Sequence, residues 1–167
     1  MAQAPIVDKT MRILVTYSLF SDCSEVEFRA ILDHIPVSKR TVQRDIHFLE
    51  QAGLIRTYFD RKTKSYIPLS VEGVEPVFPE NKTQRRYMER IIRLCYIISH
   101  ISGEENPIEW YEDHFPGLSV RTRQRDFALL NKLGVEIDYV PTDWYQPGHW
   151  VCEFPGSLYL LPLRNRL

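Results

Sequence analysis

Apolar residues recur at helical spacing in two long stretches of the chain. Within each stretch they stand three and four positions apart, which places them on one face of a helix. These residues are Met11, Leu14 and Val15 in the first stretch, and Met88, Ile91 and Ile92 in the second. Shorter amphipathic stretches at 25–34 and 107–114 each end close to a proline. The pattern predicts two groups of short amphipathic helices.

Two later regions change to runs that are typical of β-hairpins. The expected strands are 54–59 and 65–69 in the first hairpin, and 135–140 and 149–154 in the second. The first pair encloses the polar turn 60–64, whereas the second pair encloses a longer loop, 141–148, without lysine or arginine. Residues 71–83 contain one glycine and two prolines, which favours an extended linker over a helix.

One segment of the chain occurs twice. The first copy, Ser38–Gly53, reads SKRTVQRDIHFLEQAG, and the second, Ser119–Gly134, reads SVRTRQRDFALLNKLG, so eight of sixteen positions are identical. Such a repeat indicates two copies of one structural unit. Each copy is predicted to be a helix, because a serine stands where a hydroxyl caps the first turn and a glycine stands where helices end.

These elements predict a mainly α fold with small β-hairpins, built as two tandem units. The predicted divisions are a first domain at 1–70, a linker at 71–83, a second domain at 84–157 and a C-terminal tail at 158–167. The apolar residues near the start of the tail are expected to dock on their own chain or on a second copy. The second of these alternatives would make the protein a homodimer.

The polar face of the repeated helix offers side chains that suit DNA. Val42, Ile46 and Leu49 are expected to face the core, which leaves the basic and amide side chains outside. Arginine fits guanine and glutamine fits adenine in the major groove, while helix N-termini attract phosphate. The residues predicted to contact double-stranded DNA are Ser38, Lys39, Arg40, Thr41, Gln43, Arg44 and His47, with Arg61, Lys62 and Lys64 of the first hairpin, and Ser119, Arg121, Thr122, Arg123, Gln124 and Arg125 of the second copy.

The two copies also differ. Asp45 and Asp126 follow the shared arginine in both, and each is expected to pair with a local base or backbone group, because an acid facing phosphate is repelled. Arg123 replaces the core-facing Val42 and is expected to extend towards phosphate. Since the second hairpin lacks basic residues, the second unit is expected to bind weakly or to serve association.

The segment S-x-R-T-x-Q-R-D, followed by L-x-x-x-G and a hairpin, resembles the winged helix-turn-helix of DeoR-type and WYL-associated bacterial transcriptional regulators. The resemblance covers residues 8–69 well and 84–155 more loosely. It implies two tandem winged helix-turn-helix domains and a sequence-specific transcription regulator whose third helix enters the major groove. These families usually continue into an effector domain, whereas a second unit occupies the remaining length here, so no small-molecule effector is expected.

Composition limits the other classes of function. The net charge of −1 shows that the chain as a whole is not basic, so any surface that binds nucleic acid must be a local concentration of basic residues. Residues 1–70 carry ten basic and eight acidic side chains. Cys23, Cys95 and Cys152 are an odd, widely spaced set, which argues against a disulfide framework. No stretch resembles a signal peptide or a membrane span, so a cytoplasmic protein, bound to the bacterial nucleoid when active, is expected.

No enzyme motif is present, and no cofactor or metal is expected. His149 and Cys152 are the nearest approach to a metal pair, but residues three apart on a strand point to opposite faces. Trp110, Trp144, Tyr145 and Trp150 are expected to lie mainly in the core, the alternative being a surface for a protein or for single-stranded bases. Two other functions remain: a scaffold that uses winged helices for protein association, and a DNA binder like a plasmid replication initiator.

Overall fold

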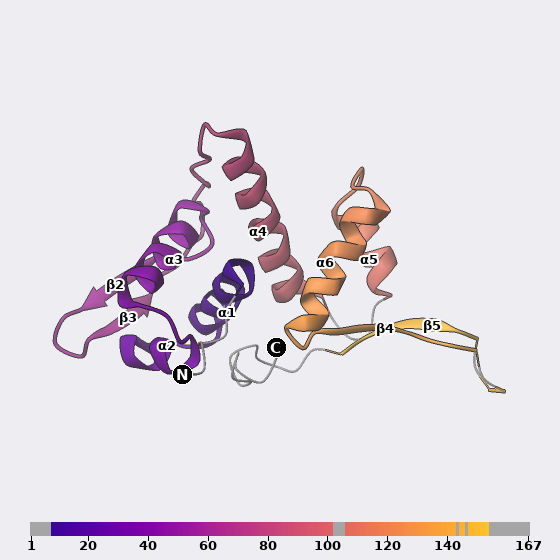
Figure 1. Ribbon diagram of the computed structural model, residues 1–167, viewed down its shortest axis with the longest axis horizontal. Helices are drawn as coiled ribbons and strands as arrows, with labels where there is room; N and C mark the ends of the chain where they lie inside the picture. Colours follow the sequence, from indigo (N-terminus) through magenta and orange to yellow (C-terminus); the bar gives the residue numbers. More distant parts are fainter. Residues whose placement is uncertain (1–7, 102–105, 143, 146, 154–167) are drawn as a thin grey trace, which may run out of the picture. The chain divides into compact units, whose positions relative to one another are not determined.

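The computed structural model describes residues 8–101, 106–142, 144–145 and 147–153, and it is mainly helical with two small antiparallel sheets (Figure 1). The expected fold class is confirmed at that level. The helices are α1 (Lys9–Asp22), α2 (Phe28–His34), α3 (Lys39–Gln51), α4 (Lys82–His100), α5 (Pro107–His114) and α6 (Val120–Lys132). The strands are β1 (Val26–Glu27), β2 (Thr57–Asp60), β3 (Ser65–Pro68), β4 (Glu136–Val140) and β5 (His149–Glu153).

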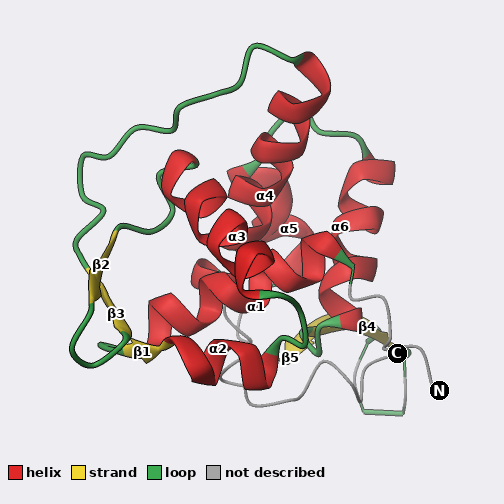
Figure 2. Cartoon of the chain, turned by 60° about the vertical axis from the view of Figure 1, so that its left-hand side comes forward, coloured by secondary structure: helices red, strands yellow, loops and turns green. Residues whose placement is uncertain are grey.

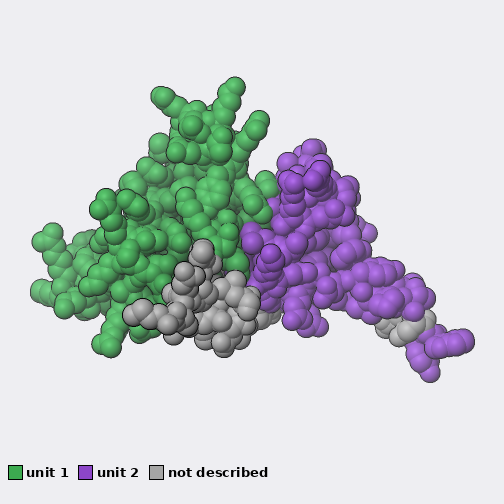
Figure 3. Space-filling model, viewed as in Figure 1, with its two compact units in different colours: residues 1–95, 157–167 green, residues 96–156 purple. Residues whose placement is uncertain are grey.

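The chain divides into two compact units, and the division falls inside α4, between Cys95 and Tyr96 (Figure 3). The expected second domain began earlier, at residue 84. The first turns of α4 instead pack with the first unit, because the Tyr87 ring lies 5.7 Å from that of Phe48 and its hydroxyl is 3.5 Å from that of Thr10. The predicted tail, 158–167, lies outside the described residues.

The core of the first unit is formed where α1 and α3 pack together. The Asp8 carboxylate begins α1 by accepting hydrogen bonds from the backbone amides of Thr10 and Met11, at 2.9 and 3.1 Å. Ile13 and Leu14 of α1 are fully buried, as is Leu49 of α3. The periodicity of the sequence predicted these helices, although α1 is longer than the apolar stretch that indicated it.

The first sheet has three strands in the order β1–β3–β2, so the expected hairpin gains an extra strand (Figure 2). The helix expected at 25–34 begins only at Phe28, because Val26 and Glu27 pair with Tyr66 and Ser65 of β3. Val26 is buried, and a β-branched side chain suits a strand. The first part of that helix prediction is therefore wrong.

The first hairpin, β2–β3, is joined directly to the end of α3. Glu50 accepts hydrogen bonds from the backbone amide and the hydroxyl of Thr57, at 3.2 and 2.8 Å. Gly53 follows α3 with a φ of +68°, where a side chain is strained, and a Cβ there would approach the Val74 oxygen to 3.0 Å. The strand expected from residue 54 starts at Thr57, because Leu54 still donates its amide to Leu49 of α3.

In the second unit, α5 and α6 are followed by the hairpin β4–β5, and among the described residues no strand corresponds to β1. Asn106 caps α5, and Ser119 caps α6. Strands β4 and β5 form a two-stranded sheet in which Ile137 lies opposite Cys152. The side chain of Asn131 near the end of α6 accepts from the Ile137 amide at 2.9 Å and donates to the Ile137 oxygen at 3.2 Å, which fixes this second hairpin to its helix.

Residues 71–81 contain no helix, as the glycine and prolines predicted, and Asn81 caps α4 through the amides of Thr83 and Gln84. Among the described helices, none combines the length and hydrophobicity required to cross a bilayer.

Candidate nucleic-acid interface

The start of α3 presents a row of exposed polar side chains. The Ser38 hydroxyl accepts the Thr41 amide at 3.2 Å and lies 2.9 Å from the Thr41 hydroxyl, so the predicted cap is present. Val42, Ile46 and Leu49 are buried, as expected. The side chains exposed around this first part of the helix are Ser38, Lys39, Arg40, Gln43, Arg44 and His47, while Thr41 is half-buried.

A buried ion pair holds α3 against α1. The Asp45 carboxylate is only 4% exposed and receives two hydrogen bonds from the Arg12 guanidinium, from Nε to Oδ2 and from Nη2 to Oδ1 at 3.1 Å. Asp45 therefore pairs with a base, as expected, but this base is not local in the sequence, because Arg12 lies 33 residues earlier on α1. A bidentate pair fixes orientation as well as distance, so the contact sets how α3 is rotated about its axis. The exposed arginines of α3 therefore face away from the core.

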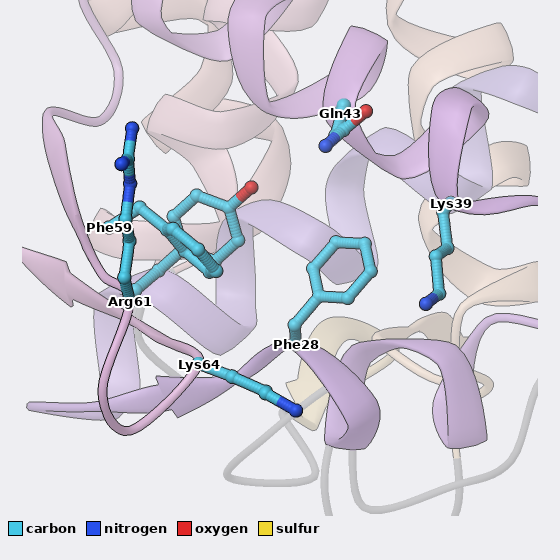
Figure 4. A pocket seen from close by; sticks show the side chains of 7 residues that line it. Phe28, Lys39, Gln43, Phe59, Arg61 and Lys64 are labelled. Carbon is cyan, nitrogen blue, oxygen red and sulfur yellow. The ribbon is translucent and has the colours of Figure 1, made fainter.

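A groove with a volume of about 630 Å³ runs between the first hairpin, α2 and α3 (Figure 4). Among the described residues that line it there are three cations and no acid. The residues are Phe28, Lys39, Gln43, Phe59, Arg61, Lys64 and Tyr66. We call this the basic groove. It brings together hairpin and helix residues that the sequence predicted separately.

The walls of the basic groove are aromatic. The Tyr66 ring lies 4.8 Å from that of Phe59 and 6.0 Å from that of Phe28. Burial, and secondarily the nearby Glu50, raise the pKa of Tyr66 above its ordinary value, so its phenol stays neutral at physiological pH. Sequence reasoning missed these aromatic residues, although Phe59 and Tyr66 lie in the two predicted strands and aromatic side chains are enriched in strands. Phe28 lies on α2 and gave no such signal.

The turn of the first hairpin directs its basic side chains outward. Lys64 has a φ of +57°, which is uncommon for a residue with a side chain. Asp60 accepts the Lys62 amide at 2.7 Å and so stabilises the turn. Arg61, Lys62 and Lys64 are all exposed. Because Arg61 and Lys64 also line the basic groove, the turn adds positive charge beside the exposed end of α3.

The start of α6 repeats the start of α3. The Ser119 hydroxyl accepts the Thr122 amide at 3.2 Å and lies 3.0 Å from the Thr122 hydroxyl. Arg121, Gln124 and Arg125 are exposed, and Thr122 is half-buried. Asp126 is buried and accepts a hydrogen bond of 2.8 Å from the Tyr111 hydroxyl, a phenol in place of the base or backbone group that the sequence predicted.

Arg123 does not extend outward, and that expectation is wrong. Its guanidinium pairs with Glu112 of α5, and its side chain is only 13% exposed. The reason is its position on the helix: Arg123 takes the place of the core-facing Val42, so its stem runs along the inner face and the charge needs a local partner. Glu112 belongs to an acidic stretch that gave no sign of this role in the sequence.

The second hairpin presents aromatic residues where the first presents cations. Trp144 and Tyr145 are 99% and 93% exposed, so the expectation that they lie in the core is wrong. Trp110 is buried as expected, whereas Trp150 is half-buried. Trp144 and Tyr145 lie in the loop joining two strands that form a sheet by themselves, and the tip of such a hairpin has little surface to pack against.

Cys95 and Cys152 are buried, and Cys23 is half-buried. Burial raises the pKa of Cys95 well above its ordinary value and also raises that of Cys152, which keeps both as neutral thiols. Cys152 is buried and His149 exposed, as expected for residues on opposite faces of a strand. Within the described part of the chain, histidine, cysteine, aspartate and glutamate form no group of three that could hold a metal ion.

No protein-family model matches the chain, and neither a curated protein nor a solved structure matches it.

Proposed function

We propose that this protein is a sequence-specific double-stranded DNA-binding transcription regulator built from two winged helix-turn-helix domains. The observation that carries the proposal is the exposed set Arg40, Gln43 and Arg44 on α3, which projects from a serine-capped helix and occurs again on α6. In this proposal α3 and α6 are the helices that enter the major groove. The hairpins are the wings.

The chemistry of α3 fits a major groove. An α-helix fits the width of that groove, where arginine can hold guanine O6 and N7 and glutamine can hold adenine N6 and N7. The N-terminus of α3 is the positive end of the helix dipole, which attracts anions. Ser38 and Thr41 lie at this end, so in this proposal they contact a phosphate at the edge of the groove. The exposed end of α3 therefore supplies both base contacts and backbone contacts.

The basic groove supplies backbone contacts beyond the helix. Arg61 and Lys64 lie on the hairpin side and Lys39 on the helix side, so a phosphate strand that passes α3 meets positive charge on both. Lys62 is exposed in the same turn. This local charge answers the objection that the whole chain is slightly acidic, because six exposed cations lie on the start of α3 and on the turn of the first hairpin: Lys39, Arg40, Arg44, Arg61, Lys62 and Lys64.

The order of elements in the first unit supports the resemblance to DeoR-type and WYL-associated regulators. Three helices are followed by a hairpin, and β1 joins that hairpin as a third strand. The shared segment S-x-R-T-x-Q-R-D forms the N-cap and the first turns of α3 and again of α6. We extend the family's role to the residues that match this segment and remain exposed.

Selection from a random duplex library with the full chain tests the proposal. We expect a recovered motif whose affinity falls by roughly 10³ to 10⁵ between 50 and 200 mM salt, as for a protein that makes six to ten phosphate contacts. The variant Arg40→Ala/Arg44→Ala should lose this specific binding while its circular dichroism stays unchanged.

The matched control is Lys82→Ala/Arg86→Ala, which removes the same charge from exposed positions on α4. We expect this variant to bind the recovered duplex like the parent protein. If no motif is recovered, or if Arg40→Ala/Arg44→Ala binds the motif unchanged, the regulator proposal fails.

A second candidate, protein association through the second unit, is favoured by one observation. Trp144 and Tyr145 are almost fully exposed at the tip of a hairpin, and exposed tryptophan and tyrosine are enriched at protein interfaces. Retention of a protein partner that depends on Trp144 and Tyr145, with no retention of the chain on duplex DNA at low salt, would favour this candidate.

A further inference from the structure

The two helices proposed to read DNA start with the same geometry. Ser38 has φ −69° and ψ 152°, and Ser119 has φ −69° and ψ 151°. The serine-to-threonine amide contact is 3.2 Å in both copies. Each helix is 13 residues long (Figure 1). Two residues that stand the same number of positions after Ser38 and after Ser119 therefore point in the same direction relative to their own helices.

The two helices are also rotated alike against their own cores. The buried face of α3 contains Asp45 and Leu49, and the same places on α6 are taken by Asp126 and Leu130, all of them buried. A helix anchored by the same face presents the same opposite face to solvent. The two units therefore present corresponding outer positions in the same way.

Three exposed side chains are identical at these outer positions. The pairs are Arg40 and Arg121, Gln43 and Gln124, and Arg44 and Arg125. Identical side chains at equivalent positions of two helices with the same geometry recognise the same pattern of hydrogen-bond donors and acceptors on base edges. We infer that one chain recognises a duplex that carries two copies of one short base sequence, one for each unit; this rests on the proposed function.

The surroundings of the two helices make the copies unequal in affinity. Lys39 is replaced by Val120, which is 55% exposed, and His47 is replaced by Ala128. The second hairpin carries no lysine or arginine across 136–153. Phosphate contacts determine much of the affinity and base contacts determine sequence. The second unit therefore shares the preference of the first but holds its copy more weakly.

The test uses the full chain and the motif recovered by selection. Three duplexes are compared: one with two copies, and two in which either copy is scrambled. Spacing is varied in steps across one helical turn, in both relative orientations. We expect the two-copy duplex at its best spacing to bind at least about tenfold more tightly than a duplex with one copy.

Two single variants then assign the copies. Selection with Arg44→Ala and with Arg125→Ala should relax the same position of the motif, but in different copies, while Arg86→Ala relaxes neither. If Arg125→Ala relaxes a different position or none, or if the motif occurs once and a second copy adds nothing, this inference is overturned, while sequence-specific DNA binding through α3 stands. If selection recovers no motif at all, the proposed function and this inference both fail.

Discussion

The two units hold equivalent helices with different chemistry. In the first unit the buried Asp45 takes a bidentate ion pair from Arg12 of α1, whereas in the second the buried Asp126 accepts a hydrogen bond from Tyr111 of α5. The equivalent carboxylate is thus contacted from a different helix and by a different group. A repeated position can keep its structural role even when its partner changes.

The link from helix to hairpin shows the same difference. Glu50 accepts two hydrogen bonds from Thr57, and at the corresponding place Asn131 both accepts from and donates to Ile137. Each contact fixes the start of the hairpin relative to the helix end. The hairpins that these contacts position then differ in surface, because cations surround the basic groove while Trp144 and Tyr145 occupy the loop of the second hairpin.

The largest expected effect distinguishes the two buried aspartates. Asp45→Ala leaves the Arg12 guanidinium, whose side chain is 12% exposed, without its counter-charge, and we expect a loss of about 3 kcal/mol in the free energy of unfolding. Tyr111→Phe removes one hydrogen bond to Asp126 and should cost about 1 to 2 kcal/mol. Urea unfolding followed by circular dichroism measures both changes. A smaller effect for Asp45→Ala than for Tyr111→Phe would contradict this ranking.

The next effect concerns the charge of the hairpins. Arg61→Ala/Lys62→Ala/Lys64→Ala should weaken DNA binding and reduce the slope of log affinity against log salt by about 0.9 for each phosphate that the variant no longer neutralises. Fluorescence anisotropy across a salt series measures the slope. The control is Trp144→Ala/Tyr145→Ala, which alters the second hairpin without changing its charge and should leave the slope unchanged. An unaltered slope in the triple variant would remove the first hairpin from the interface.

The smallest effect tests the unequal starts of α3 and α6. Lys39→Val should lower the salt slope by about 0.9 and Val120→Lys should raise it by about the same amount, because each exchange removes or adds one cation beside the capped end of a helix. The same anisotropy series measures both variants. If Lys39→Val acts as expected and Val120→Lys has no effect, α6 does not approach the phosphate backbone.

Sequence reasoning predicted the capped helices and the exposed side chains of the candidate interface, because helix caps and repeated segments are local signals. The caps at Ser38 and Ser119 follow from a hydroxyl within reach of an amide three residues on, and the exposed arginines follow from the apolar face opposite. The same reasoning failed for Arg123, whose direction depends on Glu112 in another helix. It also missed Phe28 and Tyr66, which reach the basic groove only when β1, α2 and β3 come together.

The sequence by itself determined the two capped helices, their repeated exposed residues and the hairpins that follow, since each depends on neighbours within a few positions. Only the tertiary structure decided which group meets each buried aspartate, where the compact units divide along α4 and how the basic groove is assembled. These features depend on contacts between residues far apart in the chain, such as Arg12 with Asp45. The local sequence pattern around one residue does not determine which distant side chain will contact it in the folded protein.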